Sequence, residues 1–94
     1  RIYRGECVVS PQQTGLKIDK KLPRNFVHQP FTTNKEVAKE FALMGTERNK
    51  YCKPIIIHVI ANKIKTNEDY AYFEQEVKIL TNKNKVKRIE EIEI

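Results

Sequence analysis

Ile55-Ile56-Ile57-His58-Val59-Ile60 is the stretch of this 94-residue chain that decides the fold. An almost unbroken β-branched apolar run of this kind predicts a strand covered on both faces, and therefore a central strand of a sheet. The run is far shorter than the roughly 20 apolar residues of a membrane helix, so we expect no membrane span. Charged residues make up 32% of the chain, but apolar runs interrupt them, which favours a folded domain over disorder.

The residues on either side of this strand predict one helix and three more strands. Residues 2–9 and 73–80 alternate apolar and polar side chains, which is typical of strands. Residues 86–94 follow a turn and are expected to pair back on 73–80 as a C-terminal hairpin. Residues 33–36 read Thr-Asn-Lys-Glu, a capping box that begins a helix, and Gly45 is expected to end it. The chain is thus predicted to be one α+β domain over residues 1–94.

The bulk composition limits the partners without choosing one. The net charge of +6 favours an anionic partner, which could be nucleic acid, an acidic protein surface or a phosphorylated cofactor. Cys7 and Cys52 match no metal-binding or redox spacing, and we expect two reduced thiols in a cytosolic protein. His28 and His58 have no nearby ligands at metal spacing, so no metal site is predicted.

Three local features could carry chemistry, although each has a plain structural explanation when taken alone. Glu74 and Glu76 project from the same face of a strand, roughly 7 Å apart. One carboxylate of such a pair can stabilise a developing cation while the other accepts a nucleophile's proton. The same pair is also typical of a solvated strand face. Arg4 precedes Gly5, where a phosphate could approach the backbone closely. Thr33 is explained by the capping box, whereas Thr32 has no such explanation.

In their order along the chain, these features resemble the arginine, Ser-Thr-Ser and Glu-x-Glu motifs of mono-ADP-ribosyltransferases, of the arginine-specific toxin-like or phage-like type. The segments that carry the resemblance are residues 2–6 (IYRGE), 31–42 (FTTNKEVAKEFA) and 72–80 (YFEQEVKIL). From the first segment to the last, the resemblance spans nearly the whole chain. The resemblance implies a small two-sheet core with one main helix and a C-terminal β-hairpin, as a minimal or trimmed version of the family's catalytic domain.

The resemblance also implies that NAD is a co-substrate and assigns roles to the residues of the motifs. Glu76 is implied as the catalytic carboxylate beside the nicotinamide ribose, and Glu74 as the group that orients or deprotonates an acceptor arginine on a target protein. An aromatic side chain is expected to stack on nicotinamide, and Phe41 is the candidate, although its place in the apolar stripe favours core packing. The implied NAD-binding residues are Arg4, Gly5, Thr32, Thr33 and Phe41, and the implied target-recognition residues are Tyr70, Tyr72 and Phe73.

The chain departs from the family pattern at Asn34, where a third hydroxyl is usual, and at Ala71, where an aromatic is common. Its three glycines exclude a GxGxxG dinucleotide fingerprint, so NAD would be held in another way. We expect a monomer in the cytoplasm of the producing or target cell, with a secreted effector left open. The alternatives are an NAD glycohydrolase, a transferase that modifies nucleic acid, or a non-enzymatic basic module that binds nucleic acid. Nucleic acid is not favoured, because Tyr70 and Tyr72 lie among acidic residues.

Overall fold

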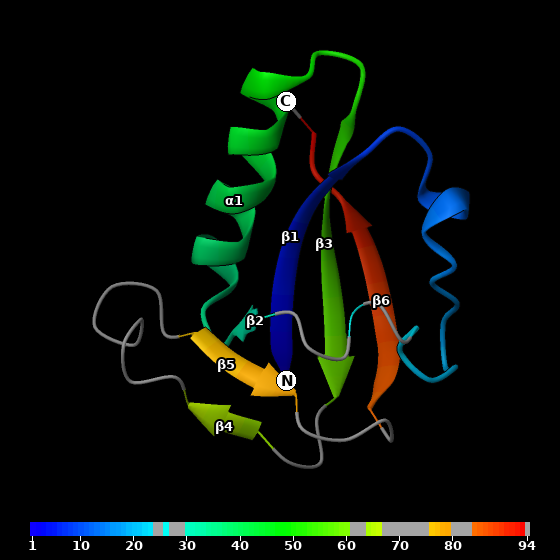
Figure 1. The fold of residues 1–94 in the computed structure, drawn as a ribbon, viewed down its shortest axis with the longest axis vertical. Coiled ribbons are helices and arrows are strands. Elements are labelled where there is room, and N and C mark those ends of the chain that lie inside the picture. The colour runs from blue at the N-terminus through cyan, green and yellow to red at the C-terminus, as the bar shows by residue number, and fades with distance from the viewer. Residues whose placement is uncertain (24–25, 27–29, 61–63, 67–75, 80–83, 94) are drawn as a thin grey trace.

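The computed structural model describes residues 1–23, 26, 30–60, 64–66, 76–79 and 84–93. It confirms the predicted α+β class (Figure 1), with one α-helix and a set of strands that pair only in antiparallel fashion among these residues. The elements are β1 (Ile2–Val8), the 3₁₀ turn η1 (Pro11–Thr14), β2 (Pro30–Thr32), α1 (Lys35–Arg48), β3 (Lys53–Ile60), β4 (Ile64–Thr66), β5 (Glu76–Ile79) and β6 (Lys85–Glu91).

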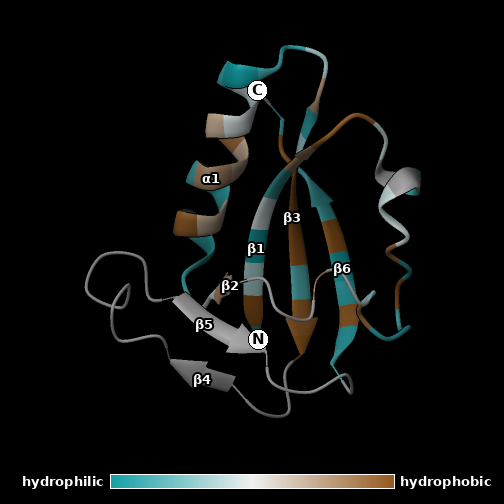
Figure 2. Ribbon diagram, viewed as in Figure 1, coloured by the Kyte–Doolittle hydropathy of each residue, from teal (hydrophilic) through white to brown (hydrophobic). Residues whose placement is uncertain are grey.

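The strand β3 is the central strand that its sequence predicts. Every residue from Pro54 to Val59 is buried, and β3 pairs with β1 on one edge and with β6 on the other. Figure 2 shows β3 as more hydrophobic than β1 and β6, the strands on either side of it. The main apolar cluster joins alternate β3 residues to the segment that follows β1; its buried members are Ile2, Leu16, Leu22, Phe26, Phe31, Ile55, Ile57, Val59 and Val86. Each such side chain contributes about 1.5–3 kcal/mol when fully buried.

The helix α1 packs on the other face of the sheet, against β1 and β3. Its N-cap is Asn34, whose side-chain oxygen accepts from the backbone N–H of Glu36 at 3.0 Å, so the predicted cap at Thr33 is wrong by one residue. Asn is at least as good a cap as Thr, and the sequence allows either. Gly45 does not end the helix either. A Cβ on Gly45 would lie 2.6 Å from the Cβ of Cys7, so this glycine lets α1 approach β1 closely.

Two features of the predicted core are wrong. The strands form one hydrogen-bonded sheet in the order β4-β5-β2-β1-β3-β6, because Thr32 pairs with both Tyr3 and Glu76 and so continues the ladder that a two-sheet core would interrupt. In Figure 1, β4 and β5 run obliquely to β1, β3 and β6. The C-terminal hairpin does not form: β5 pairs with β2 and β4, whereas β6 pairs with β3. The apolar β3 needs a partner on each edge, and β6 supplies the second one.

Cys7 and Cys52 form a disulfide, so the prediction of two reduced thiols is wrong. The ladder between β1 and β3 pairs Cys7 with Pro54, which brings Cys52 close, and the two Cα atoms are 5.3 Å apart. This separation lies within the usual range for a disulfide. Because 45 residues separate the two cysteines along the chain, no local sequence pattern indicated the bond.

No helix in the described part of the chain is long and apolar enough to cross a membrane.

Candidate functional site

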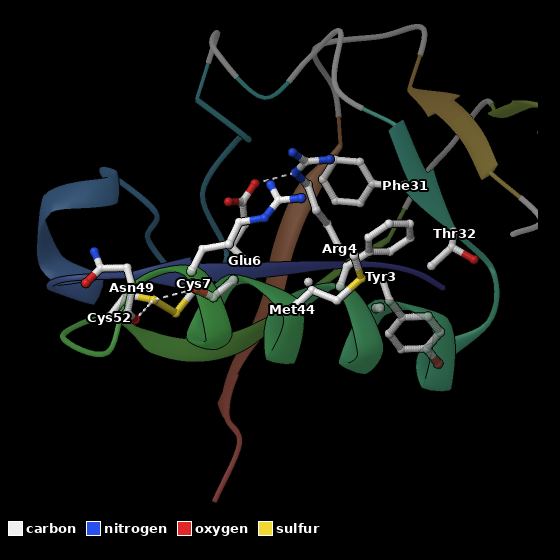
Figure 3. A pocket seen from close by; sticks show the side chains of 14 residues that line it. Tyr3, Arg4, Glu6, Cys7, Phe31, Thr32, Met44, Asn49 and Cys52 are labelled. Carbon is white, nitrogen blue, oxygen red and sulfur yellow. Dashed lines mark hydrogen bonds and ion pairs between the residues drawn. A yellow bond between two sulfur atoms is a disulfide. The ribbon is translucent and has the colours of Figure 1, made fainter. Parts of the chain in front are cut away.

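A cavity of about 490 Å³ lies along the edge of β1 that faces away from β3. Beyond Tyr3, where β2 stops pairing, β1 has only β3 as a partner among the described strands. The helix α1 and the turn that follows it complete the walls. The lining residues are Tyr3, Arg4, Gly5, Glu6, Cys7, Phe31, Thr32, Ala38, Phe41, Met44, Gly45, Arg48, Asn49 and Cys52. Figure 3 shows Tyr3 and Thr32 at one end of the cavity and the Cys7–Cys52 disulfide with Asn49 at the other.

Four of the residues that the sequence singles out for NAD binding line this one cavity: Arg4, Gly5, Thr32 and Phe41. Phe41 was expected to pack in the core, but its side chain is 39% exposed and forms part of the cavity wall. Thr33, the fifth predicted residue, is exposed and is not among the lining residues. Its predicted part in NAD binding therefore has no support from the cavity.

Arg4 is held by Glu6, a residue that was not predicted from the sequence to belong to the site. The Nε of Arg4 lies 2.6 Å from Oε1 of Glu6, and both side chains are partly buried. The two residues are two apart on β1 and so project from the same side of the strand. Figure 3 shows the two side chains meeting beside Phe31. The ion pair fixes the direction of the guanidinium, and the i, i+2 spacing of opposite charges on a strand was the signal that could have revealed it.

Thr32 occupies a junction between the sheet and the helix. Its side chain is buried, and its hydroxyl oxygen accepts from the backbone N–H of Asn34 at 3.1 Å, so it shapes the turn into α1. This hydrogen bond gives Thr32 the structural explanation that its sequence context did not supply. In register, Thr32 stands opposite Tyr3 on one side and opposite Glu76 on the other. The backbone of Glu76 is thereby only one strand away from the cavity wall.

The remaining predicted site residues lie outside the described residues. They are Glu74, Tyr70, Tyr72 and Phe73. Of the Glu-x-Glu triplet, only the backbone of Glu76 is described, as the first residue of β5. The roles predicted for these side chains stay predictions.

Gly5 is a point of close contact between β1 and α1. A Cβ built there would lie 1.7 Å from the carbonyl oxygen of Ala38, so only glycine fits beneath the helix. The buried Ala38 and Ala42 supply the small residues on the helix side. The position where Gly5 lacks a side chain therefore faces the helix backbone, and this close packing explains why a glycine is needed at position 5.

A polar cluster next to Tyr3, on the side of β3, was not predicted from the sequence. The ring of Tyr3 meets the ring of His58 edge to face, with centroids 5.1 Å apart and planes at 80°. Nε2 of His58 is 2.9 Å from Oε1 of Glu90, and Nζ of Lys35 is 2.9 Å from the same oxygen. His58 is 3% exposed. The available signal was a histidine within an otherwise apolar β-branched run.

Burial lowers the pKa of His58 below its ordinary value of 6.5, against the opposing effect of the Glu90 carboxylate. The pKa of Glu90 is lowered below 4.5, chiefly by its hydrogen bond to Lys35 and also by that to His58. At neutral pH, therefore, His58 is uncharged and Glu90 is ionised. Nε2 of His58, the nitrogen near Glu90, accordingly carries a hydrogen and donates a hydrogen bond to the carboxylate.

No group of three or more His, Cys, Asp or Glu side chains within the described ranges could hold a metal ion. A comparison of the chain with protein-family models, with curated proteins and with solved structures finds no match.

Proposed function

We propose that this protein transfers ADP-ribose from NAD to an arginine of a target protein and releases nicotinamide. The observation that carries the proposal is that Arg4, Thr32 and Phe41, which come from three separate elements, line one cavity. Thr32 also shapes the turn into α1, so the support for a binding role comes mainly from Arg4 and Phe41, whose side chains line the same cavity. The volume of about 490 Å³ falls within the usual range for small-molecule sites.

The order of the strands supports an ADP-ribosyltransferase-like core. The strand with Arg4 neighbours the strand with Thr32, which in turn neighbours the strand that begins at Glu76. The three motifs thus occupy adjacent strands, although they are far apart in the chain. A single substrate could contact all three.

The charges of the cavity suit a dinucleotide whose diphosphate is anionic. Its charged lining residues, within the described part of the chain, are Arg4, Arg48 and Glu6. An oriented guanidinium binds a phosphate with two parallel hydrogen bonds, which a lysine cannot do. Glu6 offsets part of the positive charge, but it also holds Arg4 in place before the substrate arrives. We therefore assign diphosphate binding to Arg4, with Glu6 as its positioning residue.

The chemistry follows from the bond that must break. When the bond between the ribose and nicotinamide breaks, its electron pair leaves with nicotinamide and positive charge develops on the ribose. A fixed carboxylate beside that charge lowers the barrier, and we assign this role to Glu76. A nitrogen of the acceptor guanidinium then bonds to the ribose carbon, and Glu74 takes the proton that this nitrogen loses.

The test is to incubate the protein with NAD labelled in its ADP-ribose part and with an arginine-containing peptide, and to measure nicotinamide release and peptide labelling separately. Glu76→Gln is expected to lower the rates of both reactions by at least about 100-fold, as is usual when a group that stabilises charge in the transition state is removed. Glu74→Gln is expected to lose labelling while it keeps some nicotinamide release. Glu91→Gln, on the exposed far edge of β6, is the matched control and should behave as wild type.

Each other outcome has a definite meaning. If the wild-type protein releases no nicotinamide at any pH or salt concentration, the proposal is wrong. Release that continues at full rate without labelling of peptide, protein or nucleic acid would make the protein an NAD glycohydrolase. Affinity for nucleic acid that falls steeply with salt, without NAD turnover, would instead indicate a binding module.

A further inference from the structure

We propose that the outer edge of β6 binds the phosphate backbone of double-stranded nucleic acid. The surface concerned, which we call the basic edge, consists of Lys17, Lys20, Lys21, Lys85 and Lys87. It is separate from the cavity, because β3 lies between β6 and β1 in the sheet. The proposal does not depend on the proposed function, and it gives a role to positive charge that lies outside the cavity.

Backbone hydrogen bonds bring two distant segments of the chain together at this edge. The segment that follows η1 runs beside the half of β6 that begins at residue 85 (Figure 1). The carbonyl oxygen of Val86 accepts from the N–H of Asp19 at 2.8 Å, and the N–H of Val86 donates to the carbonyl oxygen of Lys20 at 3.0 Å. The N–H of Leu22 donates to the carbonyl oxygen of Asn84 at 3.0 Å. Leu22 and Val86 belong to the buried apolar cluster, so the core anchors the backbone that carries the lysines.

Lys21 and Lys85 stand directly opposite each other in this short ladder. The hydrogen bonds between the residues on either side of them make them a non-hydrogen-bonded pair. In such a pair the Cα atoms are only about 4.5 Å apart and the side chains approach most closely. Like charges in opposite positions destabilise a sheet, and a bound anion would remove this repulsion.

The five lysines have little negative charge nearby to neutralise them. All five are exposed, and none of them forms an ion pair within the described ranges. Asp19 is the one acidic residue in the segments 16–22 and 84–87 that carry the basic edge. Arg88, the next residue of β6, is not counted, because its guanidinium lies 4.0 Å from the carboxylate of Glu90. The basic edge therefore presents a concentrated positive charge to the solvent.

The composition of the basic edge favours nucleic acid over an acidic protein surface. Lysine is depleted in protein–protein interfaces, whose binding energy comes mainly from buried aromatic and arginine side chains. Exposed lysines are, in contrast, common partners of the phosphate oxygens of nucleic acid. Lysines alone also favour a duplex, since single strands are held by stacking of their bases on aromatic rings. The objection raised by Tyr70 and Tyr72 concerns such stacking, so it does not apply to a duplex.

The number of lysines sets the expected salt dependence. If each lysine neutralises one phosphate, the logarithm of the binding constant falls with the logarithm of the salt concentration with a slope of about −4.5. The affinity should then fall about 500-fold between about 50 and 200 mM salt. Replacement of two of the five lysines should change the slope to about −2.7 and reduce the loss of affinity to about 40-fold.

The experiment measures the fluorescence anisotropy of a labelled DNA duplex of about 20 base pairs, or two helical turns, at several salt concentrations and without NAD. The test variant is the double change Lys21→Gln, Lys85→Gln. The matched control is Lys39→Gln, Lys50→Gln, which removes the same charge from exposed lysines outside the basic edge. The slope should be about −4.5 for wild type and control and about −2.7 for the test variant.

Four results would overturn the proposal. They are the absence of duplex binding at about 50 mM salt, an equal change of slope in both double variants, tighter binding of the corresponding single strand, and tighter binding of a poly-glutamate peptide of the same charge. The second would show that net charge alone is responsible, and the fourth that the partner is an acidic protein. Nicotinamide release is measured separately. Its absence would refute the proposed function alone, and a failure of duplex binding would refute this inference alone.

Discussion

Removal of the Cys7–Cys52 disulfide is expected to destabilise the protein by about 4 kcal/mol. The bond spans 45 residues. Closing a loop of that length removes about 13 cal/mol/K of entropy from the unfolded chain, which is about 4 kcal/mol at 25 °C. A domain of this size is typically stable by about 5–14 kcal/mol, so the loss would be a large share of the total. The native contacts around the bond change little, and the effect acts mainly through the unfolded state.

Guanidinium unfolding at equilibrium measures this loss. Three samples are needed: oxidised wild type, wild type reduced with an excess of a dithiol, and the double variant Cys7→Ser, Cys52→Ser. The reduced protein and the double variant should agree with each other within about 1 kcal/mol and lie about 4 kcal/mol below the oxidised protein. Their m values should be higher, because an uncrosslinked unfolded chain exposes more surface. The dithiol should have no effect on the double variant.

Two results would refute this reasoning. If both cysteines of the unreduced, denatured protein react with a maleimide, the disulfide does not exist. If the disulfide is present but its removal costs less than about 1 kcal/mol, the loop between Cys7 and Cys52 is already restricted in the unfolded chain, and the entropy argument fails.

Four further predictions concern the helix and the cluster of His58 and Glu90. Gly5→Ala should lower the unfolding free energy by about 3 kcal/mol in a denaturant titration, because its Cβ would overlap the helix backbone; an unchanged midpoint would show that α1 does not pack there. Asn34→Ala should cost about 1 kcal/mol and Asn34→Asp much less, with the thermal midpoint as the measure. Because His58 has a lowered pKa, only the unfolded chain takes up its proton just below pH 6.5, so stability should fall as pH falls through this range. The lowered pKa of Glu90 should cause a second loss below pH 4.5, and Glu90→Gln should remove that second step.

The elements that the sequence predicted well are those whose signals are local. The run of residues 55–60 is apolar and β-branched apart from His58, which favours a central strand, and β3 confirms it. The alternation in residues 2–9 likewise predicted β1. The hairpin failed because a turn signal shows where a strand ends but not which strand it pairs with. The partner of β6 is decided by the second edge of β3, and β3 is distant from β6 in the sequence.

The same distinction applies to the site. Arg4 and Thr32 were found from motifs, and both line the cavity. The cluster of His58 and Glu90 could not be found, because it depends on the register of three strands, which no short stretch of sequence encodes. The disulfide was missed for the same reason. Gly45 was misread because a glycine near a helix end serves equally well as a stop or as a contact point, and only the neighbouring strand decides.

The central place of β1 in the sheet has a consequence for the folding rate. Its ladder joins Ile2 to Val59 and Val8 to Lys53, so the middle of the sheet forms only when distant segments of the chain meet. The helix α1 lies between them and can form from local contacts within about a microsecond, whereas such long-range strand pairing is expected to take milliseconds or more. Until β3 arrives, both edges of β1 are open to pairing with other chains, so refolding at high protein concentration should favour aggregation.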